Sequence, residues 1–200
     1  MRIAADGSNY TGVLRASTLR TLHQVLGVRH FFAGTQRPSI TNQQVHAARS
    51  FGWSADIYVY LDPSVDLTTQ MELAAWAVED VPEFFRRGWY GGRLWLDAEV
   101  APPYGQSGTV WLDAAKKAAL KVGFKRLGIY TRKGWWYEHT DNTKLFSTTP
   151  LWYTAWGSDP ILNRAVWHED AFGGWRMASW KQHAADVNIN GQIFDLNVSR

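Results

Sequence analysis

The stretch Gly91–Val100, GGRLWLDAEV, has the apolar composition of a buried β-strand but ends in two acids. Side chains alternate along a strand, so Asp97 and Glu99 share one face, roughly 6.6–6.8 Å apart. Leu96 and Ala98 then point the opposite way. A desolvated charge is costly unless it is paired or used. The two acids are therefore either an ion-paired structural feature or part of a chemical site.

Two carboxyl groups this close disfavour simultaneous ionisation, so the pKa of one should rise. A protonated acid beside a carboxylate is the arrangement that glycoside hydrolysis uses. The alternative is a structural salt bridge, with Arg93 or Lys125 as the partner. The spacing alone does not separate these two interpretations, because structural ion pairs also perturb pKa values.

Strand-like and helix-like stretches alternate over the first two thirds of the chain, which predicts a parallel sheet. Thr41 and Thr68 stand where helix N-caps are expected, and four glycines follow helical patterns as C-caps: Gly27, Gly52, Gly88 and Gly123. The expected strands are 3–6, 29–34, 56–61, 93–99 and 126–131, and the expected helices are 14–26, 41–52, 68–87, 109–122 and 135–141.

The last third carries three further strands, expected at 151–156, 176–183 and 192–198, without room for long helices between them. Eight strands with about five helices predict an α/β fold, an irregular TIM-type barrel that loses its outer helices late. An open doubly wound sheet is the alternative, but no Gly-rich phosphate loop follows the first strand. At 200 residues the chain fits a single domain, 1–200.

Acids recur where the expected strands end. Asp6 ends the first strand, Asp62 the third, and Asp195 lies on the last. Chemistry in (β/α) barrels sits at the carboxyl ends of the strands. We therefore expect these acids to meet Asp97 and Glu99 at one rim.

The amino-acid composition limits the classes of binding partner and of chemistry that the sequence predicts. Twelve Trp, eight Tyr and nine Phe exceed what a core of this size needs, and surplus aromatics often line grooves for sugars. The net charge of +3 comes without a Lys/Arg run, so no nucleic-acid partner is predicted. The absence of Cys excludes disulfides and thiolate chemistry. No apolar run reaches membrane-spanning length, so no membrane insertion is expected.

Other chemistries have no support in the sequence. His168, Glu169 and Asp170 are adjacent, and neighbouring residues on one loop rarely chelate one ion. No HExxH spacing and no GxSxG elbow occur. We expect neither a metal nor a cofactor.

Six motifs, in order along nearly the whole chain, resemble the glycoside hydrolase family 25 lysozymes, the Chalaropsis-type muramidases found among phage endolysins and bacterial wall hydrolases. Gly7, Thr11, Lys181 and His183 depart from the family pattern, as does the region 29–36. The motifs are Asp6–Gly12 (DGSNYTG), Trp95–Glu99 (WLDAE), Gly128–Thr131 (GIYT), Pro150–Trp156 (PLWYTAW), Trp180–His183 (WKQH) and Phe194–Asn197 (FDLN).

The resemblance implies a (β/α)5β3 barrel that cleaves the β-1,4 bond between N-acetylmuramic acid and N-acetylglucosamine in peptidoglycan. It implies that Glu99 is the general acid/base and that Asp97 orients the substrate or stabilises charge. Asp6 and Asp195 would complete the acidic floor. Whether the substrate's N-acetyl group acts as the nucleophile stays open.

Six further residues are expected to hold the glycan. Tyr58 shares a strand face with Tyr60, but for Tyr58, as for Trp152, core packing is the competing interpretation. Residues 135–137 (WWY) are expected to be partly exposed, where they widen the groove or cap the barrel. The predicted substrate-binding residues are Tyr60, Asp62, Tyr130, Trp152, Trp156 and Gln182.

Two alternatives remain open. A chitinase-like hydrolase or glucosaminidase also uses an Asp-x-Glu, but its longer signature has Asp where this chain has Trp95. The other is a non-catalytic glycan-binding or structural barrel of a phage particle. The chain is expected to be a monomer acting on peptidoglycan at the bacterial wall. No signal peptide is apparent before Asp6, so phage lysis or a larger particle or protein would have to deliver it.

Overall fold

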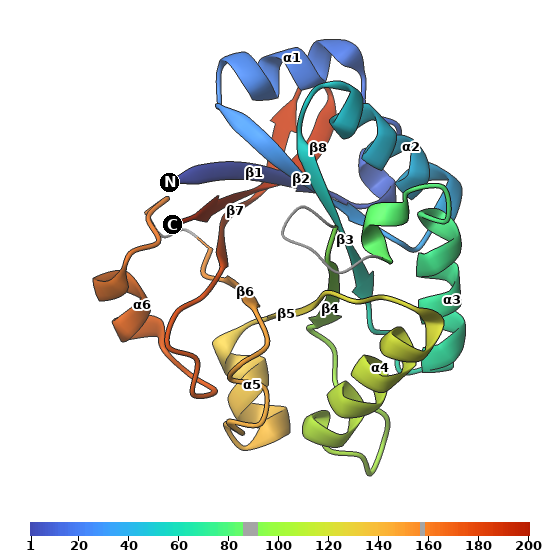
Figure 1. The fold of residues 1–200 in the computed structure, drawn as a ribbon. Coiled ribbons are helices and arrows are strands. Elements are labelled where there is room, and N and C mark those ends of the chain that lie inside the picture. The colour runs from blue at the N-terminus through green and yellow to red at the C-terminus, as the bar shows by residue number, and fades with distance from the viewer. Residues whose placement is uncertain (86–91, 157–158) are drawn as a thin grey trace.

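A computed structural model of the chain describes residues 1–85, 92–156 and 159–200. Within them a closed barrel of eight strands has helices around its outside (Figure 1). The strands are β1 (Arg2–Gly7), β2 (Val28–Gly34), β3 (Ser54–Tyr60), β4 (Leu94–Ala98), β5 (Leu127–Thr131), β6 (Leu151–Thr154), β7 (Trp180–Ile189) and β8 (Gln192–Ser199). The helices are α1 (Ala16–Gln24), α2 (Pro38–Ser50), α3 (Leu67–Ala77), α4 (Gly108–Val122), α5 (Lys133–Thr140) and α6 (Arg164–Asp170), with 3-10 turns η1 (Asn9–Thr11) and η2 (Pro82–Phe84).

The strands are neighbours in chain order, and β1 to β7 pair in parallel. The last strand, β8, runs antiparallel to both β7 and β1 and closes the ring. This pairing confirms the predicted irregular barrel and excludes the open doubly wound sheet. Arg2 pairs with Ser199, so the two ends of the chain lie together, as Figure 1 shows.

Several elements differ from the sequence prediction. The helix expected over 68–87 ends at Ala77, and a separate turn begins at Pro82, whose missing N–H does not suit a helix interior. Gly88, its predicted C-cap, lies outside the described residues. The seventh strand begins at Trp180 and continues to Ile189 because it forms a long hairpin with β8. The short helix α6 was not predicted.

Two predicted helix caps were wrong. The helix α2 begins at Pro38, a residue whose fixed φ suits the first helical turn, so Thr41 lies inside the helix. The cap of α3 is Asp66 rather than Thr68, because the Asp66 carboxylate accepts a hydrogen bond from the Thr69 amide at 3.1 Å. Left-handed backbone follows three helices at glycines predicted to end them: Gly27, Gly52 and Gly123.

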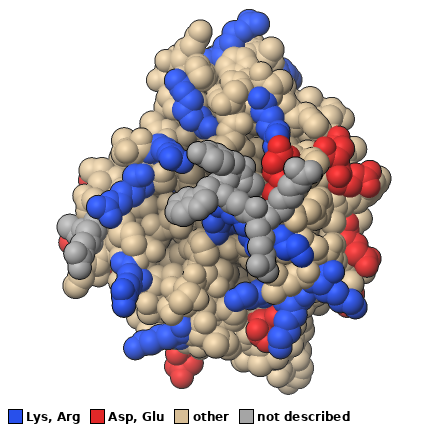
Figure 2. All heavy atoms as spheres, in the orientation of Figure 1, with Lys and Arg blue, Asp and Glu red and all other residues tan. Residues whose placement is uncertain are grey.

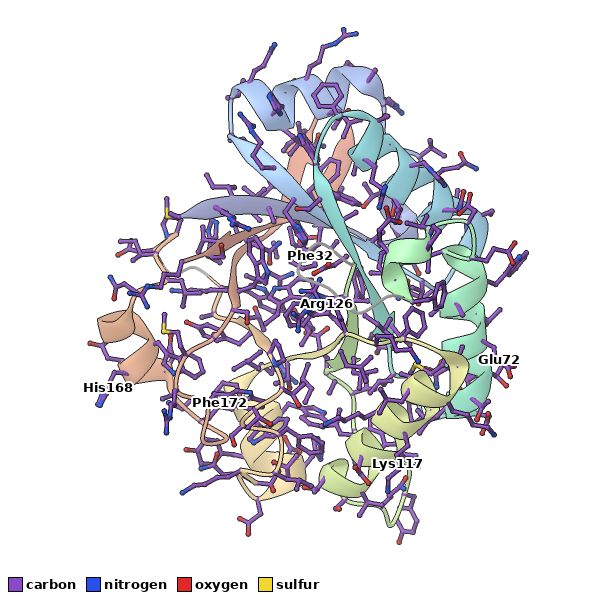
Figure 3. The ribbon with its side chains drawn as sticks, viewed as in Figure 1. Phe32, Glu72, Lys117, Arg126, His168 and Phe172 are labelled. Carbon is purple, nitrogen blue, oxygen red and sulfur yellow. The ribbon has the colours of Figure 1, made fainter. Side chains whose placement is uncertain are left out.

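Aromatic side chains fill the barrel interior. The Phe32 ring stacks on Trp152 with ring centres 4.1 Å apart, and Figure 3 shows Phe32 within the ring of strands. A Cβ built on Gly128 would overlap the Trp95 ring, so β5 passes Trp95 only as glycine. The interior cluster is Ala4, Phe32, Tyr58, Trp95, Tyr130, Trp152 and Trp180.

A second layer of aromatics packs between the strands and the helices, including Trp111, Trp135 and Trp136. In the stretch 135–137, which was expected to be partly exposed, Tyr137 is exposed but Trp135 and Trp136 are buried. Within the described part of the chain, Trp76 and Trp156 are the exposed Trp side chains, each 58% exposed. Most of the aromatic surplus is therefore core.

The molecular surface in Figure 2 carries scattered Lys and Arg side chains, whereas acidic side chains gather along the edge where Figure 1 draws α3. Among the described helices, none is long and apolar enough to cross a membrane.

Candidate active site

The four acids predicted for catalysis line one pocket. Asp6 lies near the end of β1, Asp97 near the end of β4 and Glu99 just beyond it, and Asp195 pairs with Asp6 from β8. The pocket has a volume of about 70 Å³. Its lining is completed by Tyr58, Tyr130, Trp152 and Gln182.

Asp97 is buried at the floor of this pocket, with 4% of its surface exposed. Its Oδ1 atom is buried and has no hydrogen-bond partner among the described residues. Burial, and then the nearby charges of Glu99 and Asp6, raise the pKa of Asp97 well above its ordinary value. Asp97 therefore combines a raised pKa with an unused polar atom beside the pocket.

Glu99 is partly exposed beside the same pocket. Burial raises its pKa, while a hydrogen bond with Tyr130 and the charge of Arg132 act in the opposite direction. The balance leaves the pKa above its ordinary value. Glu99 thus combines access to a ligand with a raised pKa, which a general acid requires.

Asp6 is buried and doubly hydrogen-bonded through one oxygen. Its Oδ2 accepts from Asn197 Nδ2 at 2.7 Å and from Gln182 Nε2 at 3.1 Å. Burial and the charge of Asp195 outweigh these bonds and raise the pKa of Asp6 to about 8. The repulsion between Asp6 and Asp195 therefore disfavours ionisation of both acids at once.

Gln182 on β7 links the acids to the rim of the pocket. Its Nε2 donates to Asp6 and, at 3.0 Å, to Asp195. Its Oε1 accepts from the Tyr130 hydroxyl at 2.7 Å and from Trp156 Nε1 at 2.9 Å. The sequence predicted a hydrogen bond from Gln182 to an acid or an N-acetyl group, and the structure shows two bonds to acids.

Asn197 is a site residue that was not selected from the sequence. Its Oδ1 accepts from Trp152 Nε1 at 2.8 Å, which turns its amide nitrogen toward Asp6. The signal available was its position on β8, two residues from Asp195 and hence on the same face. Trp152 is both barrel core, as one interpretation expected, and part of the pocket lining.

A second hollow, of about 340 Å³, adjoins the acid pocket. The two share Asp6, Tyr58 and Asp195. The larger hollow extends to Tyr10, which is 93% exposed, and to the β7–β8 hairpin. There Asp195 Oδ1 accepts a hydrogen bond from the Asp186 amide at 2.8 Å. The acids thus lie at the end of an open groove.

Tyr58 belongs to the interior cluster, as its sequence context favoured, and it also lines both hollows. Burial, and then the charge of Asp6, raise the pKa of Tyr58 well above its ordinary value. Its hydroxyl therefore stays neutral beside the acids, able to donate a hydrogen bond to a ligand.

Three residues predicted to bind substrate, Tyr60, Asp62 and Trp156, do not line the acid pocket. The Asp62 carboxylate accepts hydrogen bonds from the Ser64 amide at 2.8 Å and its hydroxyl at 2.6 Å, which stabilises a turn after β3. Tyr60 lies closer to the acids, because it pairs with Asp97 across β3 and β4. Partial burial and the charges of Asp97 and Glu99 raise its pKa. Trp156 lies at the rim, bonded to Gln182.

The salt-bridge interpretation of Asp97 and Glu99 is not supported. Arg93, its proposed partner, donates to the Leu127 carbonyl at 3.0 Å and lies over the Trp95 ring. Neither acid forms a salt bridge with another described residue. The pair is instead desolvated beside the pocket.

The His168–Asp170 run lies in α6, and Figure 3 shows His168 directed away from the barrel. The Asp170 carboxylate accepts a hydrogen bond from the Tyr153 hydroxyl at 3.0 Å. Across 1–85, 92–156 and 159–200, no group of three or more His, Asp or Glu side chains could hold a metal ion.

Two relatives from Dictyostelium discoideum are similar in sequence. One, described as "Probable GH family 25 lysozyme 3", is 27% identical over 158 residues, covering 76% of this chain and 31% of the relative. The other, "Counting factor 45-1", is 26% identical over 188 residues, covering 92% of this chain and 60% of the relative. The chain therefore spans less than two thirds of the length of either.

Solved structures share the fold. A muramidase from Acremonium alcalophilum superposes with a TM-score of 0.74 at 20% identity, covering 100% of this chain and 94% of that one. A bacterial lysozyme from Streptomyces coelicolor gives 0.72 at 20% identity, covering 100% and 92%. The catalytic domain of the endolysin ply40 from a Listeria monocytogenes bacteriophage gives 0.64 at 14% identity, covering 100% and 93%.

A family model for lysozyme-like protein 1 matches residues 1–183, which include the β1 and β4 acids and reach the end of the Trp180–His183 motif. With most of the chain matched and the barrel closed as the motifs implied, the chain belongs to the lysozyme-like protein 1 family, among the glycoside hydrolase family 25 lysozymes.

Proposed function

We propose that this protein is a muramidase, which hydrolyses the β-1,4 bond between N-acetylmuramic acid and N-acetylglucosamine in peptidoglycan. The observation that supports this most is the gathering of Asp6, Asp97, Glu99 and Asp195 beside one pocket that opens into a groove. Four desolvated acids that form no salt bridge with a described residue are costly to folding, which is expected where they serve a reaction.

Glu99 acts as the general acid. It transfers its proton to the glycosidic oxygen as the bond to the anomeric carbon breaks, and the electron pair leaves with that oxygen. The resulting Glu99 carboxylate then removes a proton from the water that attacks the anomeric carbon. Its partly exposed position beside the pocket suits both steps.

Asp97 supports the positive charge that develops on the sugar. Its unpartnered Oδ1 is available to the substrate's acetamido group, which it would orient toward the anomeric carbon. Asp6 and Asp195, tied together through Gln182, keep negative charge close to that carbon. Tyr130, Trp152 and Trp156 position the sugar rings, and Tyr60 and Asp62 are further substrate contacts.

The test is digestion of purified peptidoglycan by wild type and by Glu99→Gln, with the new reducing ends identified by mass spectrometry. Wild type should release N-acetylmuramic acid ends. Glu99→Gln should fold normally and lose at least about 100-fold in turnover, the usual contribution of general acid catalysis. Glu138→Gln, which removes an exposed Glu from α5, is the matched control and should keep full activity.

Each other result points to a different function. New N-acetylglucosamine ends would make the protein a glucosaminidase. Intact glycan with folded wild type would indicate a non-catalytic glycan-binding barrel. Undiminished turnover by Glu99→Gln would remove Glu99 from the reaction. As a working protein we propose a monomeric barrel, 1–200, acting at the bacterial cell wall.

A further inference from the structure

A third hollow lies on the outside of the barrel, between α2 and the end of α3. Figure 1 draws these helices side by side, and they are in contact. The hollow has a volume of about 320 Å³, and none of its residues lines the acid pocket or the adjoining groove. It is lined by Pro38, Ser39, Asn42, Gln43, Trp76, Glu79 and Asp80.

Trp76 is the apolar surface of this hollow. It is 58% exposed, although most Trp side chains of the chain are buried. It stands one helical turn after Glu72, whose side chain Figure 3 shows pointing outward from α3. Its indole N–H has no hydrogen-bond partner within the described residues. An exposed indole with a free donor combines a stacking face with a polar edge.

One wall of the hollow is held rigid. Asp80 Oδ1 accepts from Asn42 Nδ2 at 2.9 Å, and Asp80 Oδ2 lies 2.9 Å from His46 Nε2. Asn42 also donates to the Ala77 carbonyl at 3.2 Å. The bond with His46 is the main reason that the pKa of Asp80 is lowered, so this carboxylate stays charged and engaged.

The other polar side chains are free to bind a ligand. The Ser39 hydroxyl, the Gln43 amide and the Glu79 carboxylate are solvent-facing and have no hydrogen-bond partner in the described part of the chain. They offer donors and acceptors together. An ammonium ligand would present donors alone and would leave the Gln43 and Trp76 N–H groups unused. A sugar hydroxyl both donates and accepts, so it matches this set.

We propose that this hollow binds one pyranose ring of a glycan. The apolar face of the ring stacks on Trp76, and its hydroxyls bond to Gln43 and Glu79. A volume of about 320 Å³ is at the small end for ligand pockets, which suits one ring. The choice of peptidoglycan as the glycan rests on the proposed function. A second contact on the same polymer would raise the local concentration of the catalytic pocket.

The experiment is sedimentation with insoluble peptidoglycan, using Glu99→Gln protein so that the polymer stays intact. Trp76→Ala in that background should bind about tenfold more weakly, because one stacked aromatic side chain contributes roughly a factor of ten to the binding constant. Trp76→Phe should recover part of the binding. Tyr137→Ala removes an exposed aromatic of α5, 49% exposed, and should bind as the parent does.

Turnover separates this site from the catalytic pocket. With Glu99 intact, Trp76→Ala should hydrolyse a soluble tetrasaccharide as wild type does and act more slowly on insoluble peptidoglycan. Equal binding of peptidoglycan by Trp76→Ala and its parent overturns the second site and leaves the proposed function in place.

If wild type neither cuts nor sediments with peptidoglycan, the proposed function fails, and chitin and cellulose then test the hollow by itself. Retention on either that depends on Trp76 supports a glycan site. Retention on neither, or retention equal in Trp76→Ala, overturns it.

Discussion

At the scale of single residues, the acid pocket depends on carboxyl groups whose pKa values lie above their ordinary range. Burial raises the pKa values of Asp6, Asp97, Glu99 and Asp195, and their mutual repulsion adds to it for Asp6 and Asp97. Hydrogen bonds from neutral amides hold the groups in place without supplying positive charge. The site is therefore sensitive to pH in both stability and activity.

Asp6 links folding stability to pH. Its pKa is about 8 in the folded chain against an ordinary 3.8, so its contribution is complete below pH 4 and is lost as pH rises through 8. Asn at this position does not ionise. The free energy of unfolding of Asp6→Asn, relative to that of wild type, should therefore rise by on the order of a few kcal/mol between pH 4 and pH 8. Urea unfolding at both pH values measures this gain. An equal difference at both would contradict it, and Asp113→Asn, on α4, is the control.

Arg132 tunes the proposed general acid. Its positive charge lowers the Glu99 pKa against the effect of burial, so Arg132→Gln should raise that pKa. Glu99 would then stay protonated to higher pH, and the alkaline limb of the kcat/KM profile should shift to higher pH. Lys133→Gln removes the same charge from the adjacent position and should leave the limb in place. If the limb does not move in Arg132→Gln, the charge of Arg132 does not set the pKa of Glu99.

At the scale of elements, each inner strand contributes both core and chemistry. On β4, Trp95 fills the barrel and Asp97, two residues later on the same face, lines the pocket. The adjacent strand β5 has Gly128 opposite Trp95 and Tyr130 opposite Asp97. The glycine of the GIYT motif thus makes room for the ring that supports the pocket from below.

Gly128→Ala tests this packing. The added methyl group would meet the Trp95 ring on a buried strand, and overpacking of this kind costs roughly 1–3 kcal/mol. Thermal or urea unfolding measures the loss. Gly134→Ala is the matched control, because its Cβ would meet nothing within 4 Å and it lies in α5, where alanine should stabilise by up to about 1 kcal/mol. Wild-type stability in Gly128→Ala would contradict the account.

At the scale of the whole molecule, barrel closure creates the site. Asp6 and Asp195 are near opposite ends of the chain, yet they are paired residues on β1 and β8. Gln182 reaches both of them from β7. An open sheet would leave β1 and β8 at separate edges, and the contact between Asp6 and Asp195, their raised pKa values and the pocket would all be lost.

The sequence by itself determined the alternation of strands and helices, the number of strands and the acids at their ends. These features are local, because they follow from side-chain period along each element and from short motifs. It also predicted that Gln182 would bond to an acid or an N-acetyl group, and the structure shows its bonds to Asp6 and Asp195. The family resemblance rests on the same local patterns.

Only the tertiary structure decided which polar groups meet. In the folded chain, Asp62 is engaged in a turn with Ser64, and Asn197 and Tyr58 lie beside the acids. Trp135 is buried in the layer beneath α5. Such choices depend on register and closure between strands far apart in the chain. The environment of each side chain, which sets its pKa and its partners, exists only once the barrel has closed.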